Sequence, residues 1–109
     1  MGRELLGELE QLALLATLRL GDDAYGTSIR EEIEEHTHKS IAIGSLYKTL
    51  DRLAEKGLVQ AIMGASTPER GGRAKRFFSL TPLGKAALGE SVRAINAMSA
   101  GLSPSLGTL

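Results

Sequence analysis

Cationic and hydroxyl-bearing side chains are concentrated in one stretch of this chain, between residues 45 and 76. Ammonium, guanidinium and hydroxyl groups are the donors that proteins use to bind phosphate oxygens and the edges of bases. The stretch contains Ser45, Tyr47, Lys48, Thr49, Arg52, Arg70, Arg73, Lys75 and Arg76. Double-stranded DNA is therefore the partner that these residue types indicate first.

The distribution of charge supports this interpretation, although the total does not. The formal net charge is zero, whereas most nucleic-acid-binding domains are basic. Residues 1–38 hold three Arg and nine Asp or Glu, while residues 39–80 hold eight Lys or Arg and three acids. We expect a positive face suited to phosphates and an acidic face turned away from them.

Composition limits the class of protein. A chain of 109 residues with 42% apolar and 24% charged residues is sized for one globular domain. It contains no cysteine, which excludes disulfides, thiolate catalysis and cysteine-bound zinc. No apolar run approaches the roughly 20 residues of a membrane span, and the start lacks a signal-peptide core. We expect a soluble cytoplasmic protein that does not associate with membranes.

The elements that must position the basic residues are helices. A proline-free, leucine-rich segment predicts a first helix at residues 4–20, and Asp22 or Asp23 is expected to cap a second helix that runs to about residue 35. A third helix is expected at residues 43–56, ending before Gly57. Two helices, a turn and a third helix make a helix-turn-helix arrangement.

The third predicted helix has one apolar side and one polar side. Helical rotation turns Leu46, Leu50 and Leu53 inward and the polar side chains outward, with Tyr47 and Thr49 at the flanks. The outward residues are Gly44, Ser45, Lys48, Asp51, Arg52 and Glu55. A recognition helix enters the major groove by such residues. The alternatives are a solvated helix face and, for Tyr47, a ring packed across the helix pair.

Residues 58–63 and 74–80 are short strand candidates that should pair as a hairpin around a glycine-rich loop. This hairpin would form a wing, in which the 64–73 loop carries Arg70 and Arg73 along the DNA backbone. Phosphate contacts of this kind give affinity and salt dependence without reading sequence. The alternative is a solvated hairpin whose charges only keep the protein soluble.

Unmatched apolar residues predict a homodimer. The first helix is apolar on two sides, and a domain this small is expected to cover only one of them. Thr81 and Pro82 begin a last helix, to about residue 100, with an apolar stripe of its own. The expected interface consists of Leu14, Leu15, Leu18, Leu88, Val92, Ile95 and Met98. Covering helices from the same chain remain the alternative.

These elements divide the chain into three parts. Residues 4–80 form the expected winged helix-turn-helix domain, mainly α with a small β-hairpin. Residues 81–100 form a C-terminal dimerisation helix. Residues 101–109 contain turn formers without helical period, and we expect a disordered tail.

Enzymatic chemistry finds little support in the sequence. Glu32 and His36, four residues apart on a helix, could share a metal ion, but no third ligand is evident. No glycine-rich phosphate loop, Ser/His/Asp set or spaced carboxylate pair stands out. We expect no catalytic site, no metal and no cofactor.

Several motifs lie in a fixed order from Leu9 to Leu88. They are Leu9-Glu-Gln-Leu12, Ala24-Tyr-Gly26, Gly44-Ser-Leu-Tyr-Lys-Thr-Leu-Asp-Arg-Leu53, Glu55-Lys-Gly-Leu58, Gly71-Gly-Arg73 and Leu80-Thr-Pro-Leu-Gly84. In these motifs the chain resembles the PadR-type transcriptional regulators, which are winged-helix proteins. Tyr47 matches the Leu-Tyr pair of the family's recognition helix, and Arg73 matches its wing motif.

The resemblance implies a homodimeric, repressor-like protein. Its third helix and wing would bind operator DNA, expected to be an inverted repeat, and the C-terminal helix with part of the first would form the dimer. Family members often respond to aromatic or drug-like compounds, which makes a small-molecule effector conceivable here. The chain departs from the family in its single short C-terminal helix and in Phe77 and Phe78, where aromatic residues with hydroxyls are common.

One rival remains, a winged-helix module that binds protein instead of DNA, because a fold does not fix a function. Such a module should show apolar residues on the outward face of the third helix. This chain places Lys48 and Arg52 there. The charge therefore favours DNA.

Overall fold

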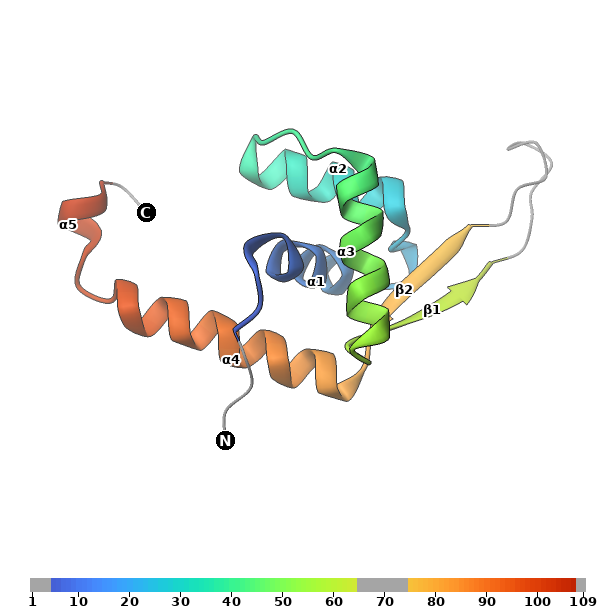
Figure 1. The fold of residues 1–109 in the computed structure, drawn as a ribbon. Coiled ribbons are helices and arrows are strands. Elements are labelled where there is room, and N and C mark those ends of the chain that lie inside the picture. Colours follow the sequence, from blue (N-terminus) through green and yellow to red (C-terminus); the bar gives the residue numbers. More distant parts are fainter. Residues whose placement is uncertain (1–4, 65–74, 108–109) are drawn as a thin grey trace.

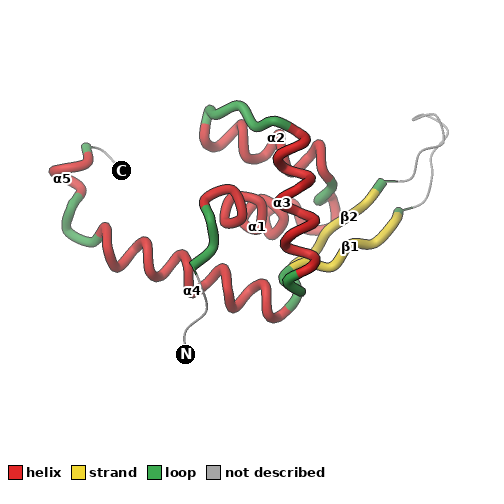
Figure 2. Tube along the Cα trace, viewed as in Figure 1, coloured by secondary structure: helices red, strands yellow, loops and turns green. Residues whose placement is uncertain are grey.

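The protein is a helical body from which a hairpin and a long helix extend (Figures 1 and 2). The computed structural model describes residues 5–64 and 75–107. Its elements are α1 (Glu8–Leu20), the short 3-10 helix η1 (Gly21–Asp23), α2 (Gly26–Thr37), α3 (Ile43–Glu55), β1 (Val59–Met63), β2 (Arg76–Leu80), α4 (Pro82–Ser99) and α5 (Ser103–Leu106). This order confirms the predicted fold, mainly α with a winged helix-turn-helix topology.

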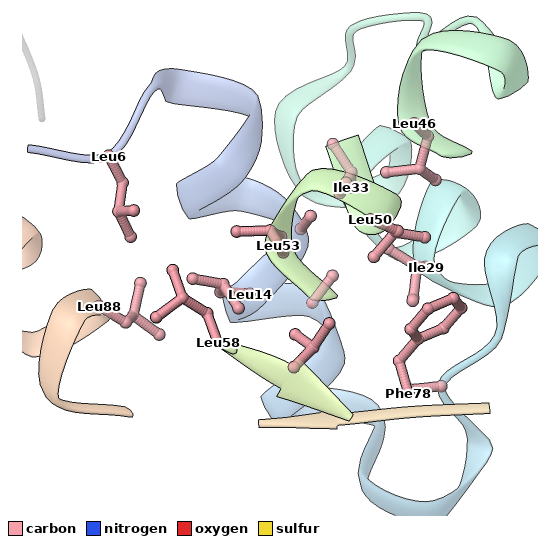
Figure 3. Close-up of a cluster of buried hydrophobic side chains, with 14 of the residues drawn as sticks. Leu6, Leu14, Ile29, Ile33, Leu46, Leu50, Leu53, Leu58, Phe78 and Leu88 are labelled. Carbon is pink, nitrogen blue, oxygen red and sulfur yellow. The ribbon is translucent and has the colours of Figure 1, made fainter. Parts of the chain in front are cut away.

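The core lies where α1, α2 and α3 meet the base of the hairpin (Figure 3). The stripe of α3 predicted to face inward is fully buried, because Leu46, Leu50 and Leu53 are each 0% exposed. Phe78 from β2 and Leu88 from α4 complete this cluster. One continuous core therefore joins the three helices to the wing and to α4.

The first helix begins later than predicted, at Glu8 and not at residue 4. Gly7 has an extended backbone, and its N–H donates to Glu10 Oε1 at 2.9 Å, which caps the helix. The residue before it, Leu6, donates its N–H to Ser91 Oγ of α4 at 3.2 Å. The entry segment is thus tied to α4 instead of extending α1.

The buried Glu10 also joins α1 to the end of α3, because Lys56 Nζ donates to its Oε2 at 2.8 Å. Burial raises the pKa of the Glu10 carboxyl, but hydrogen bonds from Lys56 and Gly7 and the positive charge of Lys56 together lower it below its ordinary value. The carboxylate is therefore stabilised in its charged form.

The second helix also begins later than predicted, at Gly26. The expectation that Asp22 or Asp23 caps it is wrong, since both lie in the η1 turn. Ser28 does the capping work: its hydroxyl accepts from Tyr25 N–H at 2.9 Å and donates to Asp23 O at 2.5 Å. The sequence pointed to Asp22 and Asp23 as caps. The hydrogen bond at the start of α2 is made instead by Ser28, a residue inside the helix, which accepts from Tyr25 N–H.

The start of α4 has the capping predicted for it. Thr81 Oγ1 accepts from Gly84 N–H at 3.0 Å and donates to Gly57 O at 2.6 Å, and Pro82 occupies the first turn. Gly57 has a φ of 75°, the left-handed conformation expected after α3. The same threonine therefore begins α4 and holds the turn that ends α3.

The other end of α4 extends away from the body (Figure 1). Its buried residues end at Ser91, and beyond Val92 the side chains of Ile95 and Met98 are 55% and 79% exposed. In the predicted tail, Ser103–Leu106 forms a helical turn with a proline in its first turn, and its residues are exposed. Among the described helices, none has the length and apolar character needed to cross a bilayer.

Gly84 allows α4 to approach the chain at Leu58. A methyl group on Gly84 would lie 1.9 Å from the Leu58 carbonyl oxygen, which is backbone and cannot swing aside. We expect Gly84→Ala to lower the free energy of unfolding by about 1–3 kcal/mol through overpacking. Urea denaturation followed by circular dichroism measures this.

The matched control is Gly44→Ala, on an exposed helical position where nothing lies within 4 Å of the added methyl group. That change should leave stability equal or slightly higher, because alanine favours helix over glycine. Equal stability of wild type and Gly84→Ala would show that α4 does not pack this closely.

Candidate nucleic-acid interface

The outward face of α3 is the centre of the candidate interface. Ser45, Lys48 and Arg52 are all exposed and lie at positions i, i+3 and i+7 of one helix, so they form a single stripe. The small Gly44 precedes them in an open position. The inward leucines fix this orientation, since the helix cannot turn about its axis without exposing them.

Thr49 does not belong to this stripe. It is only 5% exposed, and its helical position places it between Leu46 and Leu53 on the buried side. The flank that we assigned to it from the sequence is in fact part of the core. Its inclusion among the DNA-binding candidates is therefore a mistake that the structure corrects.

Tyr47 lies at the edge of the stripe and packs across to α2. Its ring end and hydroxyl occupy the space that a side chain at Gly26 would fill, with the hydroxyl 2.3 Å from the position of a Cβ there. The residue is still 40% exposed. The ring thus packs on the start of α2, as one interpretation predicts, while contact of Tyr47 with DNA stays a prediction.

The hairpin pairs β1 and β2 antiparallel, from Val59 opposite Leu80 to Met63 opposite Arg76. A third segment joins it. Phe78 donates its N–H to Ala24 O at 2.8 Å, and an isolated bridge links Tyr25 to Phe77. The base of the wing is thus anchored on the segment that leads into α2, which the sequence did not reveal.

The two described cations of the wing are half-buried and already have partners. Lys75 Nζ lies 3.9 Å from the ring centroid of Tyr25. Arg76 Nη2 lies 2.5 Å from Asp51 Oδ1, and its guanidinium carbon lies 4.9 Å from the ring centroid of Phe78. These side chains are therefore held against the protein and are not freely extended. The other two wing candidates, Arg70 and Arg73, lie outside the described residues.

The predicted dimer residues divide into two groups. Leu14 and Leu88 are 0% and 5% exposed and belong to the core, so their assignment to a subunit interface is corrected. The reason is that elements of the same chain cover them, the alternative left open for α1. The remaining residues are half-buried or exposed: Leu15, Leu18, Val92, Ile95 and Met98.

A hollow joins the exposed parts of α1 and α4. Its volume is about 410 Å³, and its lining includes Leu12 and Leu15 from α1 and Ile95 from α4. A second hollow, of about 280 Å³, lies between α1 and α2 and is lined in part by Leu18. Both hollows lie on the side of α1 where the unmatched apolar residues are exposed.

Glu32 and His36, the candidate metal pair, form an ion cluster with Arg19. Glu32 Oε2 accepts from Arg19 Nε at 2.9 Å and lies 2.9 Å from His36 Nε2. The hydrogen bond from Arg19 holds the pKa of the Glu32 carboxyl below its ordinary value, and His36 adds to this effect. Within residues 5–64 and 75–107, no three His, Cys, Asp or Glu residues gather as a metal site would require.

Comparison with known proteins identifies the family. Residues 14–90, most of the chain, match the sequence model of the transcriptional regulator PadR-like family. The chain belongs to this family. The winged-helix fold described above is thus that of a PadR-like protein.

Two relatives are similar to this chain in sequence. Protein X of Lysinibacillus sphaericus, which is uncharacterised, is 36% identical over 89 residues, covering 80% of this chain and 77% of its own length. The transcriptional regulator Rv3488 of Mycobacterium tuberculosis is 34% identical over 74 residues, covering 68% of this chain and 64% of its own length.

Solved structures show the same fold. A PadR-like transcriptional regulator from Bacillus cereus has a TM-score of 0.73 at 21% identity, with 93% of each chain covered. A PadR family transcription regulator from Clostridium difficile has a TM-score of 0.75 at 22% identity, covering 93% of this chain and all of the other. The family match and the regulator from Mycobacterium tuberculosis together identify a PadR-like, DNA-binding transcriptional regulator.

Proposed function

We propose that this PadR-like protein is a homodimeric repressor that acts in the cytoplasm and binds operator DNA with α3 of each subunit in the major groove. The observation that carries the proposal is the exposed polar stripe of α3, with Ser45, Lys48 and Arg52 on one face. The hydroxyl can approach phosphates closely, while the two cations reach base edges or phosphates.

The charge of the neighbouring surface agrees with this orientation. The exposed acids Glu31 and Glu35 lie on α2, whereas the exposed face of α3 carries two cations, Lys48 and Arg52, beside two acids. These acids are Asp51, which is paired with Arg76, and Glu55. DNA repels the acidic surface of α2, while the two cations of α3 can contact the duplex. The loop at residues 64–73, with Arg70 and Arg73, is proposed to follow the backbone beside it.

The dimer in this proposal is formed by α4 with part of α1. Exposed Ile95 and Met98 on the projecting half of α4 and exposed Leu15 and Leu18 on α1 are apolar groups that a second subunit would remove from water. Two-fold symmetry would place the two recognition helices about 34–36 Å apart. An inverted-repeat operator follows from that symmetry.

Release by a small ligand is part of the proposal. The hollow between α1 and α4, lined by Leu12, Leu15 and Ile95, lies on the proposed dimer face. An apolar or aromatic compound bound there could change the relation between the two subunits. Plain packing of the same residues by the second subunit is the alternative.

The rival function, a protein-binding module without DNA binding, draws on one observation. Ile62 and Met63, on β1, are 57% and 60% exposed, which gives the wing an apolar edge. Against it, the outward stripe of α3 is polar and cationic. Binding to duplex DNA decides between the two.

For the recognition helix, we expect Lys48→Ala and Arg52→Ala each to weaken operator binding by about 5- to 150-fold, because a good contact to a base contributes about 1–3 kcal/mol of discrimination. Binding to a random duplex should fall less. Fluorescence anisotropy with a duplex selected from genomic fragments, and with a scrambled duplex, measures both affinities at several salt concentrations.

Arg93→Ala is the matched control, because Arg93 is an exposed cation on α4, which extends away from α3. It should bind both duplexes as wild type does. Equal losses on the two duplexes would make Lys48 and Arg52 backbone contacts, and no loss from either variant would contradict the proposed role of α3.

For the dimer, we expect wild type to sediment as a dimer at micromolar concentration and Ile95→Glu to sediment as a monomer. A carboxylate buried in an apolar interface without a partner would cost about 3 kcal/mol or more, which is over 100-fold in the dissociation constant. Ile62→Glu, the same change on the exposed β1 strand, should remain dimeric. A monomeric wild type would contradict the proposed interface.

A further inference from the structure

Lys75, which precedes β2, and the first residues of β2 alternate between the two faces of the hairpin, and each face is held by a different part of the protein. Lys75 and Phe77 lie toward Tyr25, the residue before α2. Arg76 and Phe78 lie on the other face, where Arg76 meets Asp51 of α3. This alternation follows from strand geometry, in which successive side chains point to opposite faces.

On the α3 side, Arg76 is held in a defined position. Its guanidinium carbon lies 4.9 Å from the ring centroid of Phe78, a side chain that is itself only 2% exposed. Its Nη2 lies 2.5 Å from Asp51 Oδ1, and its Nε is buried with no hydrogen-bond acceptor among the described residues. Arg76 therefore links the hairpin to the recognition helix and has little freedom to extend.

On the α2 side, Tyr25 makes three contacts with Lys75 and Phe77, at the start of β2. Its ring receives the Lys75 ammonium at 3.9 Å, and it meets the Phe77 ring edge-on, with centroids 5.6 Å apart and planes at 74°. Its backbone also forms the isolated bridge to Phe77. Cation–π and aromatic contacts of this kind each contribute at the level of a weak ion pair.

The rest of the hairpin is not packed against the body of the protein along β1. Residues 60–63 of β1 are all exposed, so packing of β1 alone does not fix the direction of the wing. The contacts that Asp51 and Tyr25 make with β2 lie next to the point where the described part of the wing ends. Changing either contact should therefore change the angle of the wing to α3.

From this geometry we propose that Asp51 and Tyr25 are positioning residues for DNA binding, which hold the wing at a fixed angle to α3. The proposal rests on the proposed function, because the angle matters only if helix and wing bind one duplex together. This role also explains why α3 carries the acidic Asp51 on its proposed DNA-facing side. The ion pair with Arg76 offsets the negative charge of Asp51 and orients β2.

The direction in which operator affinity changes in Asp51→Asn separates a positioning role from a simple charge effect. Asp51→Asn removes a negative charge from the recognition helix, which by charge alone should strengthen binding to every duplex. If Asp51 positions the wing, the same change weakens operator binding by about two- to fivefold, the range of a partly exposed ion pair. Glu55→Gln is the matched control, since Glu55 is also an exposed acid on α3.

Tyr25 is tested by a pair of substitutions. Tyr25→Phe keeps the ring and should bind the operator as wild type does, whereas Tyr25→Leu removes the ring and should weaken binding by about two- to fivefold. Affinities for operator and scrambled duplexes are measured by anisotropy at about 0.1 M salt, where surface charges interact over about 10 Å.

A measurement without DNA makes the result independent of the proposed function. Backbone ¹⁵N relaxation of residues 59–63 and 76–80 should show larger fast motion in Asp51→Asn and Tyr25→Leu than in wild type, Glu55→Gln or Tyr25→Phe. Tighter binding by Asp51→Asn, equal to that of Glu55→Gln, together with unchanged relaxation would overturn the proposal. If wild type binds neither duplex, the DNA-binding function fails, and relaxation alone decides whether these residues hold the hairpin.

Discussion

Burial of one side of α3 fixes the orientation of this helix in the fold. Leu46, Leu50 and Leu53 are each fully buried, and burying a leucine contributes about 1.5–3 kcal/mol. Rotating the helix by one residue in either direction would expose these side chains and bury a charged one, Arg52 or Asp51. The packing energy of the core therefore decides that Lys48 and Arg52 face outward, which is the arrangement a DNA-binding surface needs.

The elements around α3 are held in one frame by contacts at short range. At the end of α3, Thr81 bonds to Gly57, and Gly84 lets α4 approach the Leu58 carbonyl. At its start, Gly26 leaves room for the ring of Tyr47. The wing is joined to this frame through the segment before α2 and through Asp51. Helix, the base of the wing and α4 thus pack on one another, while the far half of α4 remains uncovered.

Local chemistry explains what could be predicted from the sequence. The period of the α3 leucines and the Thr81-Pro82 cap involve neighbouring residues only, so their assignments are confirmed. Placements that depend on distant packing were harder. Thr49 and Leu14 looked available but are covered by other elements, and the Arg76–Asp51 pair joins residues 25 positions apart. No local sequence pattern predicts such contacts between residues that are far apart in the chain.

We propose that the polar stripe of α3 meets DNA and that the acidic side of α2 does not. Amide chemical shifts of ¹⁵N-labelled protein, recorded during titration with an operator duplex, distinguish the two surfaces. We expect large shifts at residues 44–52 and little change at Glu31 and Glu35 on the exposed side of α2. Shifts concentrated on α2, with residues 44–52 unchanged, would contradict it.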